Sequence, residues 1–136
     1  MTEVVLDASV VSKWFRVDGE RHLDPARSLR ATFEAGQLAI LAPPLLRLEI
    51  VNVARGRWDW GESALVELAG ALGELGFEFE EPDLERVASW TARGLTAYDA
   101  AYVALAEARG TTLITDDDLV VAVAPEVVTA LAKTEP

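Results

Sequence analysis

The chain contains no cysteine and only one histidine, His22, among its 136 residues. Disulfide bonds and thiolate metal sites are therefore excluded, as is zinc chemistry that needs several imidazole ligands. Any metal ion bound here must be held by oxygen atoms. Long apolar runs are missing too. No apolar stretch approaches the roughly 20 residues that a helix needs to cross a bilayer. Acidic Glu3 stands where a signal peptide carries basic residues, so we expect a cytoplasmic protein.

Basic residues are also scarce, with 12 Lys and Arg against 23 Asp and Glu and a net charge of −11. This balance argues against a nucleic-acid binder, which usually presents a basic surface. The objection weakens if several carboxylates converge on divalent cations, because bound ions invert the local field and attract phosphate. Arg47, Arg55 and Arg57 lie close together, as do Lys13 and Arg16. A solvated helix face explains those arginines equally well.

Apolar residues make up 51% of the chain, enough for a sizeable core in a domain of common size. We expect one domain over residues 1–136. Short apolar or β-branched runs alternate with longer amphipathic stretches, which predicts an α/β fold with a mainly parallel sheet. The expected strands are 4–6, 38–42, 77–80, 112–115 and 127–131, and the period-two alternation of 77–80 suits an edge strand.

The expected helices lie between these strands, at 10–15, 25–35, 45–55, 62–75, 83–93 and 96–109, with a short one after 118. Asp24 is predicted to cap the second helix, with Pro25 as its first residue and Gly36 as its stop. Gly110 is predicted to end the helix at 96–109.

Four acidic residues follow strands or begin helices of this predicted fold. Asp7 follows the first strand, and Glu49 lies in the first turns of the helix after the second strand. Asp99 is in the first turn of its helix, and Asp117 follows the strand that ends at Thr115. The carboxyl ends of parallel strands and the starts of the helices that follow share one edge of the sheet. We therefore predict that the four carboxylates meet at that edge.

Each acid also has a purely structural interpretation. Thr96-x-x-Asp99 fits a capping box, and Asp7 fits an Asx turn. The run of aspartates at 116–118 fits a solvated loop that caps the next helix. Glu49 is harder to explain in this way, because it lies on the core-facing side of its helix. A carboxylate there costs several kcal/mol unless it is paired or binds a metal.

Like charges gathered without a metal repel one another and raise some of their pKa values, so the acidic cluster is best explained as a cation site. Oxygen ligands without sulfur or imidazole favour Mg²⁺ or Mn²⁺. Such ions activate water and stabilise the in-line displacement at a phosphodiester. The residues themselves thus predict hydrolysis of phosphodiester bonds.

Four segments carry a family resemblance that spans essentially the whole chain. They are VLDAS at 5–9, LE at 48–49 with Asn52, LTAYDAAY at 95–102 followed by ALA at 104–106, and LITDD at 113–117. In these segments the chain resembles the PIN-domain toxins of VapBC toxin–antitoxin modules, also called the VapC family. The third segment and its spacing to the fourth are the most specific.

The resemblance implies a PIN-like three-layer α/β/α sandwich with a mainly parallel sheet of about five strands. It also implies a type II toxin with endoribonuclease activity, a homodimer, and a VapB-type antitoxin that covers the active site, with DNA contacted only through that antitoxin. Matched by position, the acidic ligands are Asp7, Glu49, Asp99 and Asp117, with Ser9 and Thr115 as supporting hydroxyls. The family pattern of threonine, any residue, aspartate selects Asp117, but Asp116 and Asp118 leave that choice open.

Other functions were weighed on the same residues. A phosphatase of the haloacid-dehalogenase kind also has an aspartate after its first strand, but it needs a second one two residues on, where this chain has Ser9. A dinucleotide-binding fold fails because no G-x-G-x-x-G follows the first strand. The remaining alternative is a catalytically silent PIN-like domain that serves as a protein-interaction partner, although the presence of all four acids argues against it.

Overall fold

The computed structural model describes residues 2–134 and is built on a five-stranded sheet in which every neighbouring pair is parallel. The strands are β1 (Thr2–Leu6), β2 (Leu38–Ala42), β3 (Glu78–Phe79), β4 (Leu113–Thr115) and β5 (Val128–Ala130), in the order β3-β2-β1-β4-β5. The short β3 forms one edge, as its alternating pattern predicted. β1 lies in the centre of the sheet, and its last three residues are apolar and buried.

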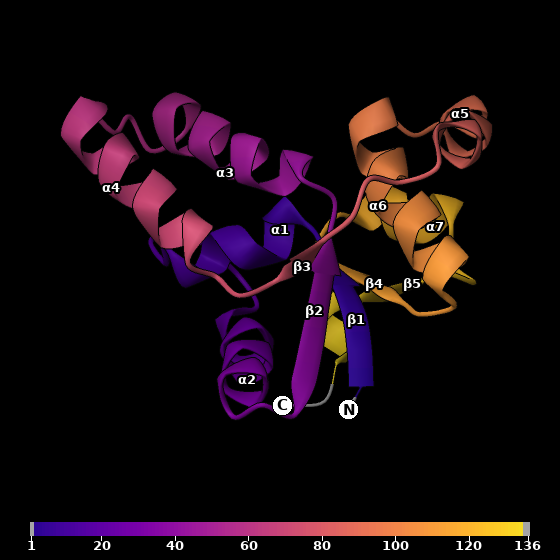
Figure 1. Cartoon of the computed structure of the whole chain (residues 1–136), viewed down its shortest axis with the longest axis horizontal. Coiled ribbons are helices and arrows are strands. Elements are labelled where there is room, and N and C mark those ends of the chain that lie inside the picture. The colour runs from indigo at the N-terminus through magenta and orange to yellow at the C-terminus, as the bar shows by residue number, and fades with distance from the viewer. Residues whose placement is uncertain (1, 135–136) are drawn as a thin grey trace.

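Helices cover both faces of this sheet (Figure 1). They are α1 (Ala8–Val11), α2 (Leu23–Glu34), α3 (Leu45–Gly56), α4 (Glu62–Gly73), α5 (Leu84–Ala92), α6 (Ala97–Arg109) and α7 (Asp118–Val123), with short 3-10 helices η1 (Ser12–Trp14) and η2 (Leu131–Lys133). Figure 1 shows α2, α3 and α4 on one side of the sheet and α5, α6 and α7 on the other. The predicted three-layer α/β/α arrangement is confirmed.

The core is deepest where α6 packs on β1 and β4. Every residue of α6 from Ala100 to Ala106 is buried, and the small alanines among them let the helix lie close to the sheet. Thr96 caps the start of α6 by accepting from the backbone N–H of Asp99, and Gly110 ends it in the left-handed conformation, as predicted. These caps fix the position of the first turn, where Asp99 lies.

The predicted start of α2 was wrong. The helix begins at Leu23, and its N-cap is His22 rather than Asp24. His22 has a φ of 56°, a left-handed conformation that is uncommon outside glycine. The His22 Nδ1 atom is hydrogen-bonded to the carboxylate of Asp116, 94 residues later in the chain. This tertiary contact outweighs the local capping preference of Asp24. Pro25 is still tolerated, because the first four N–H groups of a helix have no partner within it.

Between residues 2 and 134, no helix combines the length and the apolar composition that a bilayer crossing requires.

Candidate active site

The four predicted acids all lie at the carboxyl edge of the sheet or at the start of the helices next to it. Asp7 follows β1 and is the N-cap of α1, and Asp117 follows β4 and is the N-cap of α7. Glu49 lies in the second turn of α3, and Asp99 lies in the first turn of α6. The topology therefore places all four at one edge. Their carboxylates do not converge as closely as predicted, because no three acidic side chains of residues 2–134 are near enough to share one metal ion.

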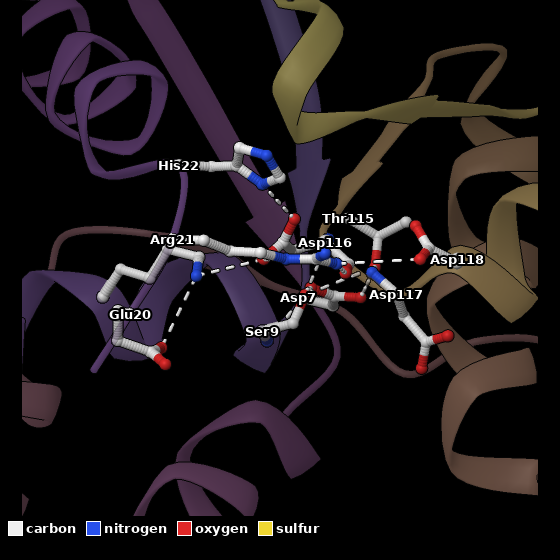
Figure 2. A network of polar contacts seen from close by, with 10 residues as sticks. Asp7, Ser9, Glu20, Arg21, His22, Thr115, Asp116, Asp117 and Asp118 are labelled. Atoms are coloured by element: carbon white, nitrogen blue, oxygen red, sulfur yellow. Dashed lines mark hydrogen bonds and ion pairs between the residues drawn. The ribbon is translucent and has the colours of Figure 1, made fainter.

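Asp7 is buried at this edge, with an exposed fraction of 6%, and both of its oxygens are hydrogen-bonded (Figure 2). Ser9 donates to Oδ1 through its backbone N–H at 3.1 Å and its hydroxyl at 2.6 Å. Thr115 donates its hydroxyl to Oδ2 at 2.5 Å. Ser9 and Thr115 thus support Asp7 directly, from α1 on one side and β4 on the other.

Burial raises the pKa of Asp7 from 3.8 to about 7. The hydrogen bonds from Ser9 and Thr115 act in the opposite direction, because they favour the ionised carboxylate. Repulsion from Asp99 and Glu49 adds to the effect of burial. Asp7 therefore lies within electrostatic reach of two other acids of the predicted set.

Glu49 is half-buried on α3 and accepts a short hydrogen bond from the hydroxyl of Tyr102 on α6. Burial raises the pKa of Glu49, the bond from Tyr102 lowers it, and repulsion from Asp99 raises it again. Burial and the neighbouring Glu49 also raise the pKa of Tyr102, so its hydroxyl stays protonated and keeps donating. Tyr102 joins α6 to α3 across the site.

Asp99 is the acid that connects the others. Burial raises its pKa first and repulsion from Asp117 raises it further, whereas hydrogen bonding by Thr96 lowers it. The backbone N–H of Asp99 donates to the Thr96 hydroxyl at 3.1 Å. Among the hydrogen bonds of residues 2–134, however, none runs from the Thr96 N–H back to the Asp99 carboxylate. The capping box is therefore only half formed, and the carboxylate of Asp99 does not serve as its second half.

The three consecutive aspartates differ in what surrounds them. Asp117 accepts from the backbone N–H of Leu119 at 2.9 Å and of Val120 at 3.4 Å, and so caps α7. Asp118 is exposed, and its only described ion pair is a 3.8 Å contact with Arg21. Asp117 is the one whose charge raises the pKa of Asp99.

Asp116 lies in a basic environment instead. Its carboxylate is 2.8 Å from His22 Nδ1, 3.1 Å from Lys13 Nζ and 3.3 Å from Arg21 Nε. Burial alone would raise the pKa of Asp116, but the hydrogen bonds from His22 and Lys13 outweigh it and the pKa is lowered. The carboxylate is thus ionised and already neutralised by protein cations.

Two residue sets at the site were not singled out from the sequence. Tyr102 belongs to the family motif at 95–102, and its position three residues after Asp99 predicts that both lie on the same helix face. That spacing is a signal for a site residue. The partners of Asp116 left no comparable signal, because Lys13 and His22 lie about a hundred residues away in the chain. Glu49 has its hydrogen-bond partner in Tyr102 and not in Arg47 or Arg55, which lie on its own helix.

Two hollows border the acids. A polar one of about 520 Å³ is lined by Ser9, Lys13, Arg21, Arg57 and Asp117, among others. An apolar one of about 660 Å³ extends from Glu49 past the exposed side chains of Leu48 and Tyr98. Over residues 2–134, no three Asp, Glu or His side chains are close enough as placed to hold one metal ion together.

Comparison with known proteins gives one family match. The family model of the PIN domain matches residues 4–124. No curated protein sequence matches significantly.

Three solved structures are similar in fold. PAE2754 from Pyrobaculum aerophilum is 24% identical, with a TM-score of 0.68 over 96% of this chain and 90% of its own. VapC20 from Mycobacterium tuberculosis, described as a toxin that cleaves the sarcin–ricin loop, is 15% identical, with a TM-score of 0.65 over 88% and 93%. FitAB bound to an IR36 DNA fragment is 16% identical, with a TM-score of 0.63 over 98% of both chains. At these identities the likeness shows the shared fold alone.

Proposed function

The chain belongs to the PIN-domain family, and we propose that it is a Mg²⁺- or Mn²⁺-dependent endoribonuclease that acts as the toxin of a type II toxin–antitoxin module. One observation carries the proposal. Asp7, Glu49, Asp99 and Asp117 lie at one edge of the sheet. Burial raises the pKa of Asp7 and of Asp99, and neighbouring acids raise both further: Asp99 and Glu49 act on Asp7, and Asp117 acts on Asp99. Four carboxylates from four separate parts of the chain are thus linked by pairwise repulsion, with Asp99 as the common neighbour.

Such an arrangement stores unfavourable electrostatic energy unless a cation offsets it. The donors are all carboxylate oxygens, which fit a hard divalent ion. We infer that Asp7, Glu49, Asp99 and Asp117 hold this ion and that binding draws them closer together than they now lie. A bound Mg²⁺ or Mn²⁺ would supply water activation and charge stabilisation for phosphodiester hydrolysis.

The chain's own residues hold this cluster in place. Ser9 and Thr115 fix the orientation of Asp7 and keep its oxygens in a set direction. Tyr102 does the same for Glu49 from the opposite helix. Orienting Asp7 and Glu49 in this way limits the movement that ion binding and the reaction would require.

The assignment of Asp117, rather than either neighbour, rests on charge. Asp116 is neutralised by Lys13, Arg21 and His22, and Asp118 is exposed. Asp117 is the aspartate of the three that repels Asp99. We therefore include Asp117 in the ion-binding set.

We propose a VapB-type antitoxin as the partner, with DNA contacted only through it. The similar VapC20 is described as a toxin, and FitAB was solved as a complex on DNA. An antitoxin that supplies basic and apolar side chains would complement the acidic cluster and the neighbouring apolar hollow. A homodimer is also proposed, on the family resemblance.

The proposal is tested by incubating the purified chain with single-stranded and hairpin RNA in Mg²⁺, in Mn²⁺ and in EDTA. We expect cleavage with either ion and none with EDTA, accompanied by a metal-dependent rise in melting temperature. A folded protein that binds neither ion and cleaves no RNA would contradict the proposal and favour the catalytically silent, protein-binding alternative.

A further inference from the structure

Asp116 lies in the turn between β4 and α7, and its side chain is only 11% exposed. Three basic side chains contact it. Lys13, Arg21 and His22 all contact its carboxylate. Figure 2 shows Arg21 and His22 beside Asp116, and Arg21 Nη2 also donates to the backbone oxygen of Asp116 at 3.2 Å. Lys13 is almost fully buried, with 3% of its side chain exposed, although a lysine is seldom buried without a partner. Among residues 2–134, its carboxylate contacts are Asp116 at 3.1 Å and Glu20 at 3.5 Å.

The backbone at His22 departs from its usual range to reach this contact. Its φ of 56° is unfavourable for a residue with a Cβ, and such a conformation persists only where the surrounding structure enforces it. Here Nδ1 lies 2.8 Å from Oδ1 of Asp116. The segment before α2 is thus tied to the turn between β4 and α7, which is distant in sequence.

The same turn is connected to Asp7 through two hydroxyl groups. The backbone N–H of Asp116 donates to the Ser9 hydroxyl at 2.9 Å, and that hydroxyl donates to Asp7 at 2.6 Å. The next N–H, of Asp117, donates to the Thr115 hydroxyl at 3.1 Å, and this hydroxyl donates to Asp7 as well. A shift of the turn would therefore disturb both hydroxyls that orient Asp7 and would move Asp117 too.

We propose that Asp116 is a positioning residue, which Lys13, Arg21 and His22 hold in place so that the β4–α7 turn keeps Ser9, Thr115 and Asp117 aligned with Asp7. Asp116 itself does not bind the ion, because its oxygens are taken up by protein cations. The consequence for catalysis rests on the proposed nuclease function. The effect of Asp116 on the order of the turn does not depend on that function, and it can be measured without metal or RNA.

The main variant is Asp116→Asn, which keeps the side-chain shape and the backbone N–H but removes the charge. The matched control is Asp118→Asn. It also removes one negative charge, but from an exposed side chain two residues after Asp116. In metal-free protein, we expect Asp116→Asn to speed hydrogen exchange at the amides of Asp117, Leu119 and Val120 by at least about tenfold relative to the control. Exchange in α5 should be unchanged.

The second readout is Mn²⁺ affinity, measured by direct titration, together with kcat and KM for RNA cleavage. Loss of a group that orients metal ligands typically lowers affinity or activity by about 10–100-fold. We expect Asp116→Asn to weaken Mn²⁺ binding and lower kcat in that range, with KM changed less than about twofold. Asp118→Asn should leave all three values within about twofold.

If Asp116→Asn lowers only the melting temperature, with turn exchange and Mn²⁺ affinity equal to the control, the ion pairs are merely structural and the proposal is overturned. If Asp116→Asn does not fold, the double variant Arg21→Gln with His22→Gln removes two of the three contacts, and it is expected to fold because these side chains are 58% and 33% exposed. A wild-type chain without nuclease activity would refute the proposed function, whereas the exchange and Mn²⁺ measurements would still decide this inference.

Discussion

The Tyr102 hydroxyl donates a hydrogen bond to Oε1 of Glu49, and this bond joins the two helices, α6 and α3, that face each other across the candidate site. The tyrosine ring is 1% exposed, so its position is set by the core. A hydroxyl fixed in this way can orient a carboxylate that the flexible glutamate chain would otherwise leave free to rotate. The contact thus links core packing to the geometry of the site.

Replacing Tyr102 with phenylalanine should preserve the packing of the ring and remove only this donor. Because hydrogen bonding lowers the pKa of Glu49, its loss should raise that pKa further and weaken ion binding. We expect kcat to fall by about tenfold or more and the unfolding free energy by about 1 kcal/mol. Urea denaturation and RNA cleavage assays measure these effects, with the exposed Tyr98→Phe as control. Equal kcat in both variants would show that the bond is dispensable.

The edge where the four acids lie could be predicted because it depends only on element order. Alternating strands and helices in a parallel sheet fix where each strand ends and where each helix begins. Asp7, Glu49 and Asp99 could therefore be placed at that edge from the sequence alone, although their distances from one another could not. The caps at Thr96 and Gly110 were equally predictable, since they depend on residues within one turn of each other.

The contacts among distant side chains could not be predicted in this way. His22, rather than Asp24, begins α2, because an interaction with Asp116 across 94 residues overrides a local preference. The three aspartates at 116–118 look equivalent in sequence, and only the groups packed around them separate their environments. Local patterns carry no record of which side chains a fold brings together.

Asp99→Asn should abolish Mg²⁺- or Mn²⁺-dependent RNA cleavage while the fold is retained. The amide keeps the shape of the carboxylate, but it cannot supply the negative charge that the ion requires. If Asp99 served only as a first-turn acid of α6, the change would cost at most about 1 kcal/mol of stability and no activity. Cleavage assays and thermal denaturation separate the two roles. Glu85→Gln, in the first turn of α5, is the matched control, and wild-type activity in Asp99→Asn would refute the metal role.

Glu49→Gln should also lose activity, yet metal-free stability should hold or rise. Burial and the charge of Asp99 both raise the pKa of Glu49, so its ionised form is disfavoured in the folded protein. Glutamine removes the charge and still accepts from the Tyr102 hydroxyl through its side-chain oxygen. Metal should then raise the melting temperature of the wild type more than that of the variant. Exposed Glu67→Gln on α4 serves as the control, and a marked metal-free destabilisation of Glu49→Gln alone would indicate a structural role instead.

Metal-free stability should depend on pH through Asp7, whose pKa is raised from 3.8 to about 7, chiefly by burial. Because the folded protein holds this proton more tightly than the unfolded chain, the contribution of Asp7 is fully present below about pH 4 and is lost as pH rises through about 7. The difference between the two pKa values corresponds to roughly 4 kcal/mol. Asp7→Asn cannot titrate, so its unfolding free energy should fall less than that of the wild type between pH 4 and pH 8. Asp83→Asn, which alters an exposed N-cap on α5, should follow the wild-type curve.

Saturating Mn²⁺ should stabilise the wild type more at pH 8 than at pH 5, because the ion binds the deprotonated carboxylate. Parallel pH curves for Asp7→Asn and wild type in EDTA would show that Asp7 is already ionised at low pH and that its burial does not hold the proton.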